Sequence, residues 1–68
     1  MRETEMPEII NIRGQLHART ERDILFSTDG DQESAVWLPL ARIEIGPLAH
    51  GVGIVTMPAD LAEQRGLS

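Results

Sequence analysis

Apolar and polar residues alternate without interruption from Ile10 to Arg19, and this pattern constrains the fold more than any other feature of the chain. A period of two residues predicts a long strand with one buried face. Gly14 falls on the inner face, where it indicates a bulge or a bend of the kind that curls small barrels. His17 falls on the outer face. We expect it to be a solvent-facing histidine, because no second His, Cys or paired carboxylate shares its spacing.

The 68 residues predict a single domain, 1–68, with residues 1–8 as a flexible start. A domain of this size buries only about 60% of the surface that its unfolded chain exposes, so its stability is marginal. The chain has no Cys and only two His, which leaves neither a disulfide nor a zinc site to supplement the core. We therefore expect no metal and no cofactor, and packing or a partner must stabilise the fold.

A hairpin is predicted where "DILFST" and "SAVWLPL" flank "DGDQE". Asp29 and Gly30 are residue types that suit turns with positive φ. Asp29, Asp31 and Glu33 do not have the spacing of an EF-hand calcium loop, so we interpret them as a solvated turn. If the turn is functional, it acts as a protruding acidic tip.

Pro39 interrupts the apolar stretch "VWLPLARIEI" and explains why a strand ends there. Proline lacks the N–H that a central strand needs, so it fits an edge position or the exit from a sheet. "LAR" then predicts a short 3-10 turn, and "IEI" a new strand with Ile43 and Ile45 inward and Glu44 outward. A strand, a short helical turn and a strand around a corner are typical of SH3-like barrels. Trp37 either closes one end of the barrel, which we favour, or is a partly exposed anchor for a partner.

The C-terminal third predicts a loop, a strand and a helix. "GPLAHGVG" has the Gly and Pro content of a loop, and "VGIVTM" has the composition of a last strand. In "PADLAEQRGL", Pro58 suits the first helical position and Gly66 a left-handed cap. Two helical turns are unstable alone, so Leu61 and Leu67 must pack on the sheet or on another subunit, which leaves a homodimer open. The predicted fold class is mainly β (α+β): a small SH3-like, strongly bent five-stranded antiparallel sheet or barrel with one short C-terminal helix.

The charge balance disfavours direct binding to nucleic acid. Eleven acidic residues face six basic ones, all of them Arg, which gives a net charge of -5. Affinity for phosphate backbones comes mainly from Lys and Arg, so this chain starts at a disadvantage. The acidic surface is either an ordinary soluble one or a face that meets a basic protein. "MRETEMPEII" lacks the features of a signal peptide and no stretch is long enough to span a membrane, so we expect a protein of the bacterial cytoplasm.

The segments "VWLPLARIEI" and "VTMPADLAEQRGL" resemble a group of small uncharacterised proteins of phages, prophages and plasmids. That group has a W-[IL]-P-x-x-x-[IV]-E segment followed by V-T-x-P-x-x-L-A-x-x-x-G-L. "GQLHARTERDILFSTDG" is similar to its first hairpin, so the likeness covers nearly the whole chain. The resemblance implies a mobile-element context and brings no known activity with it.

"VTMPADLAEQRGL" is also similar to one half of the motif of swapped-hairpin transition regulators and antitoxins. Those proteins bind DNA as dimers. This resemblance implies an alternative function as a DNA-binding regulator. In this chain, however, the motif comes last and Lys is absent.

No catalytic signature is present, so we expect a non-enzymatic protein that works by binding. The leading hypothesis is an accessory protein of a mobile element, which in its sharpest form is an anti-CRISPR-type inhibitor that occludes a basic, nucleic-acid-binding surface of a host complex. The expected partner is a host protein or nucleoprotein complex with a basic surface. The candidate partner-binding residues are Glu21, Asp23, Asp29, Asp31, Glu33 and Trp37.

Overall fold

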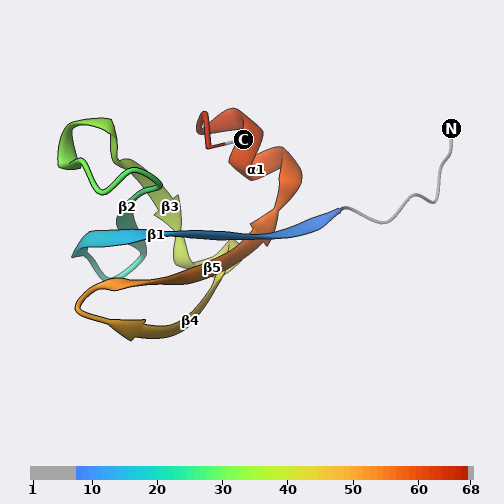
Figure 1. Ribbon diagram of the computed structural model, residues 1–68. Helices are drawn as coiled ribbons and strands as arrows, with labels where there is room; N and C mark the ends of the chain where they lie inside the picture. The colour runs from blue at the N-terminus through green and yellow to red at the C-terminus, as the bar shows by residue number, and fades with distance from the viewer. Residues whose placement is uncertain (1–7, 68) are drawn as a thin grey trace, which may run out of the picture.

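The computed structural model describes residues 8–67 and consists mainly of β-strands (Figure 1). The predicted flexible start lies outside the described residues except for Glu8. The elements in chain order are β1 (Ile9–Arg19), β2 (Asp23–Ser27), β3 (Val36–Pro39), β4 (Glu44–Ala49), β5 (Val52–Pro58) and helix α1 (Ala59–Gln64). Two short 3-10 turns, Gln32–Ser34 and Leu40–Arg42, precede β3 and β4 respectively. The predicted fold class of five antiparallel strands and one C-terminal helix is confirmed.

The five strands form one antiparallel sheet in the order β3-β2-β1-β5-β4. The long strand β1 lies at the centre, with β2 on one side and β5 on the other. The edges are β3 and β4, which the Leu40–Arg42 turn connects around the predicted corner. Between residues 8 and 67 no ladder pairs β3 with β4, so the sheet has two edges.

The core lies between the inner face of the sheet and helix α1. Partly buried apolar residues of β1, including Ile10, Ile12 and Leu16, pack against it as the alternation predicted. Burial of these side chains is the main stabilising contribution to a domain of this size. The buried apolar residues are Ile24, Phe26, Leu38, Ile43, Val55, Met57, Leu61 and Ala62.

Gly14 allows a close approach across the inner face, but the bulge predicted there lies elsewhere. A Cβ at Gly14 would overlap the carbonyl oxygen of Ser27 and stand 2.6 Å from Cζ of Phe26. The register between β1 and β2 shifts between Leu16 and Ala18, so the bulged residue is His17. The glycine is required because the Phe26 ring occupies the space of a side chain, and the strand changes register only after it has passed that ring.

The edge strand β3 ends at Pro39 as predicted. The Leu40 amide donates to the Arg22 carbonyl at 2.7 Å, and Pro39 contributes no N–H to the free edge. Arg65, just after α1, donates from Nε to the Trp37 carbonyl at 2.9 Å. An arginine and a proline thus reduce the unpaired backbone groups that this edge offers to another chain.

The segment predicted as a loop, residues 46–53, is mostly strand. β4 continues to Ala49, and the connection to β5 is the two-residue turn His50–Gly51, with φ of 55° and 80°. Positive φ at both positions defines a type I′ turn, whose twist matches that of the flanking strands. Gly46 and Pro47 lie where the β4–β5 register shifts, so they belong to a bulge in an edge strand. The prediction of a loop from the Gly and Pro content of this segment is therefore wrong.

Helix α1 ends in the predicted left-handed cap. Pro58 directly precedes the first helical residue, one position earlier than expected, and Gly66 has a φ of 75°. The amides of Gly66 and Leu67 donate to the carbonyls of Glu63 and Ala62 at 3.1 and 2.8 Å. This is a Schellman motif, and it brings Leu67 back onto the core.

Candidate protein-binding surface

Trp37 lies on the outer face of the sheet and is 45% exposed. The preferred prediction that Trp37 closes one end of the barrel is wrong. Its partial exposure agrees with the alternative, and its role as an anchor for a partner stays a prediction. Its neighbours Val36 and Leu38 point to the inner face, where Leu38 is fully buried. Side chains alternate along a strand, so Trp37 must point the other way.

Three residues on adjacent strands form an apolar row across the outer face. Trp37 of β3 is paired with Leu25 of β2, and Leu25 is paired with Ala18 of β1. Paired residues of antiparallel strands lie on the same face with their side chains in reach of each other. We call Ala18, Leu25 and Trp37 the Trp37 row. Leu25 and Ala18 are half-buried, so the indole is the most prominent part of the row.

The acidic loop between β2 and β3 projects beyond the ends of these two strands (Figure 1). Asp29, Asp31 and Glu33 are all exposed there. The Asp29 carboxylate accepts from the Asp31 amide at 2.9 Å and from Ser34 Oγ at 2.8 Å, and Asp31 accepts from the Glu33 amide at 3.0 Å. Gly30 has a φ of 80°, which such a turn requires. Two of the three acidic side chains therefore also shape the loop.

Hydrogen bonds hold the Asp29 carboxyl in its charged form. The pKa of Asp29 is lowered below its usual value, first by the Asp31 amide and then by the Ser34 hydroxyl. A hydrogen bond donated to a carboxylate favours the ionised state. Asp29 therefore keeps its negative charge to a lower pH than an unperturbed aspartate would.

Glu21 and Asp23 lie at the opposite end of β2. Glu21 is exposed, whereas Asp23 is half-buried and paired with Pro39. Thr20 organises this turn, because its hydroxyl accepts from the Asp23 amide at 3.0 Å. The structure thus separates the predicted acidic residues into two groups, with the Trp37 row between them. Arg19 and Arg22 flank Glu21, so the acidic loop is the more negative end.

His17 and Ser27 form a polar contact that the sequence did not predict. His17 is half-buried, contrary to the prediction of a solvent-facing side chain, and its Nε2 lies 2.8 Å from Ser27 Oγ. Ser27 is fully buried, so His17 satisfies a hydroxyl that would otherwise lack a partner. A substrate cannot reach a buried hydroxyl, which argues against this pair as a nucleophile and base. The pairing depends on the bulge at His17, and nothing in the local sequence indicates that bulge.

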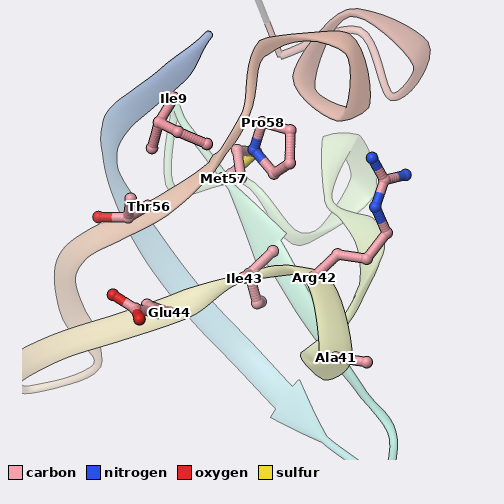
Figure 2. A pocket seen from close by; sticks show the side chains of 8 residues that line it. All are labelled: Ile9, Ala41, Arg42, Ile43, Glu44, Thr56, Met57 and Pro58. Carbon is pink, nitrogen blue, oxygen red and sulfur yellow. The ribbon is translucent and has the colours of Figure 1, made fainter. Parts of the chain in front are cut away.

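The outer face has a second feature on the β4 side of the sheet. A hollow of about 400 Å³ lies between the start of β1, the end of β5 and the Leu40–Arg42 corner (Figure 2). Across residues 8–67 no group of three His, Asp or Glu side chains is placed to hold a metal ion. The same described residues include no helix of the length and apolarity needed to cross a membrane.

Comparison of the chain with protein-family models, with curated proteins and with solved structures found no match.

Proposed function

We propose that this chain is a non-catalytic binding protein that recognises a basic protein surface through the Trp37 row and the acidic groups beside it. The single observation that carries the proposal is the position of Trp37. It is 45% exposed on a strand whose Val36 and Leu38 side chains pack in the core, and acidic residues lie at both ends of the neighbouring strand.

The chemistry of this surface suits protein recognition. Tryptophan is the residue type most enriched among those that dominate binding energy at interfaces, because it buries a large area at a small entropic cost. Asp29, Asp31 and Glu33, exposed on the loop that leads into β3, would attract a basic partner and orient it during approach. The expected complement is an apolar recess rimmed by Lys or Arg.

The resemblance to mobile-element proteins suggests the biological setting. In its sharpest form, the protein is an anti-CRISPR-type inhibitor that acts in the bacterial cytoplasm. There it occupies a basic surface on which a host complex would otherwise bind nucleic acid. Its net charge of -5 is consistent with such competition, since the inhibitor carries the same sign of charge as the displaced ligand.

A binding assay with matched variants tests the proposal. Purified RNA-guided nuclease complexes would be challenged with the wild type, Trp37→Ala and Ile54→Ala, with binding and DNA cleavage as readouts. Ile54 is 47% exposed on the outer face but lies outside the Trp37 row, so it is a control for loss of exposed apolar area. We expect Trp37→Ala to lose binding and Ile54→Ala to keep it.

A second comparison tests the charges. Glu33→Gln should weaken binding at low salt, and Glu63→Gln, the same charge change on α1, should have little effect. Binding that both Trp37→Ala and Glu33→Gln leave unchanged would reject this surface. Retention of DNA by the wild type at low salt, without binding to a protein complex, would instead favour the DNA-binding regulator.

A further inference from the structure

The hollow on the outer face is lined by apolar side chains from three segments (Figure 2). Ile43 and Met57 are buried beneath it, and Pro58 of β5 lines it beside them. Ile9 of β1 also lines the hollow and is 57% exposed, more than any other large apolar side chain between residues 8 and 67. An exposed isoleucine beside an apolar hollow indicates a surface that a partner covers.

One positive and one negative charge lie on the β4 side of this hollow. Arg42 and Glu44 flank Ile43, both line the hollow, and Figure 2 shows their side chains on opposite sides of Ile43. Arg42 forms an ion pair with Asp60 at 3.3 Å, but both side chains are about half exposed. Such a pair is weak, and a guanidinium has five N–H donors, so Arg42 can bind a second carboxylate.

We infer that this hollow is the contact surface of a homodimer. A two-fold axis that passes between Arg42 and Glu44 places Arg42 of each copy opposite Glu44 of the other copy. The same axis brings the two hollows together, so that each Ile9 is covered by the other subunit. A surface with one apolar centre and two opposite charges is complementary to itself, as a two-fold interface requires.

Two other observations favour a second copy over a different occupant. Arg42 and Glu44 line the rim with one charge of each sign, a pattern that can pair with a copy of itself, and Asp60 lies beside them as the ion-pair partner of Arg42. A small core without disulfides also gains most from assembly.

The inferred interface is separate from the Trp37 row, which lies on the β3 side of the sheet. A dimer built in this way therefore presents two Trp37 rows to partners. The inference and the proposed function can consequently succeed or fail independently.

Sedimentation equilibrium with two charge reversals tests the dimer. The wild type should change from monomer to dimer as its concentration is raised. Glu44→Arg and Arg42→Glu should each weaken self-association by roughly tenfold or more, because each reversal sets like charges across the axis. An equimolar mixture of the two variants should recover the dimer, since every pair across the axis is again complementary. Thermal unfolding of each variant checks that the monomer remains folded.

Two outcomes would overturn the inference. One is a wild type that stays monomeric at every concentration. The other is a dimer that resists both charge reversals but dissociates on Trp37→Ala, which would place the interface on the Trp37 row.

Discussion

The two faces of the sheet use the same strands for different purposes. On the inner face of β2 and β3, Ile24, Phe26 and Leu38 are fully buried in a core cluster that also includes residues of β5 and α1. On the outer face of the same strands, the larger Trp37 remains 45% exposed. Aromatic character alone does not distinguish these positions, because the Phe26 ring is buried and the Trp37 ring is exposed. The comparison indicates that the inner face stabilises the fold and the outer face is available for recognition.

The sharpest way to test this comparison is to truncate two adjacent residues of β3. Leu38→Ala should destabilise the domain by about 2–5 kcal/mol, because it leaves a cavity in the core. Trp37→Ala removes a larger side chain but should cost only about 1 kcal/mol or less, since a surface substitution creates no cavity. Chemical denaturation with fluorescence and circular dichroism measures both. Equal losses of stability in the two variants would contradict the division between the faces.

A similar contrast exists one strand further along the sheet, at Gly14 and Gln15 of β1. Gly14→Ala should destabilise by roughly 1–3 kcal/mol or more, because its methyl group meets the Phe26 ring at 2.6 Å and overlaps the Ser27 carbonyl. Gln15→Ala changes the neighbouring residue on the outer face and should shift the free energy of unfolding by about 0.5 kcal/mol or less. Thermal denaturation of the two variants provides the test. A stable Gly14→Ala protein would mean that the ring and the strand are not held as closely as the structure indicates.

Much of the inner face could be predicted from the sequence, because burial there follows local patterns. The alternation at Ile10 and Ile12, the corner at Pro39 and the cap at Gly66 each depend on a property of one or two neighbouring residues. The outer face depends on pairing between distant strands. The bulge at His17 is a register shift in the pairing of β1 with β2, and the exposure of Trp37 depends on the inner face being filled by other residues. The acidic loop was identified from its residue types, and the predicted hairpin also placed Glu21 and Asp23 at the other end of the strand that precedes the loop.

The His17–Ser27 pair offers a finer test, because it lies where the bulge changes the alternation. His17→Ala should cost about 1–3 kcal/mol, since it leaves the buried Ser27 hydroxyl without a partner. Adding Ser27→Ala to that variant removes the unpaired hydroxyl and should restore part of the loss. Denaturation of both single variants and the double variant completes the cycle. Strictly additive losses would show that the two side chains do not interact.

The smallest expected effect concerns the acidic loop, where the prediction is a change in the pKa of a single carboxyl group, that of Asp29. The Asp29 pKa is lowered, so the loop contacts that favour its carboxylate are fully present above the ordinary value of 3.8 and are lost as the pH falls through the lower, folded value. Ser34→Ala removes one of the two main donors and should raise the Asp29 pKa partway toward 3.8, while the Asp31 amide keeps the rest of the shift. A carboxyl-carbon NMR titration measures this directly, with Thr28→Ala as a control in the same loop. An Asp29 pKa that is unchanged in Ser34→Ala would mean that the backbone alone organises the loop. The Asp29 pKa would then be lowered by the backbone amide of Asp31 and not by the Ser34 hydroxyl.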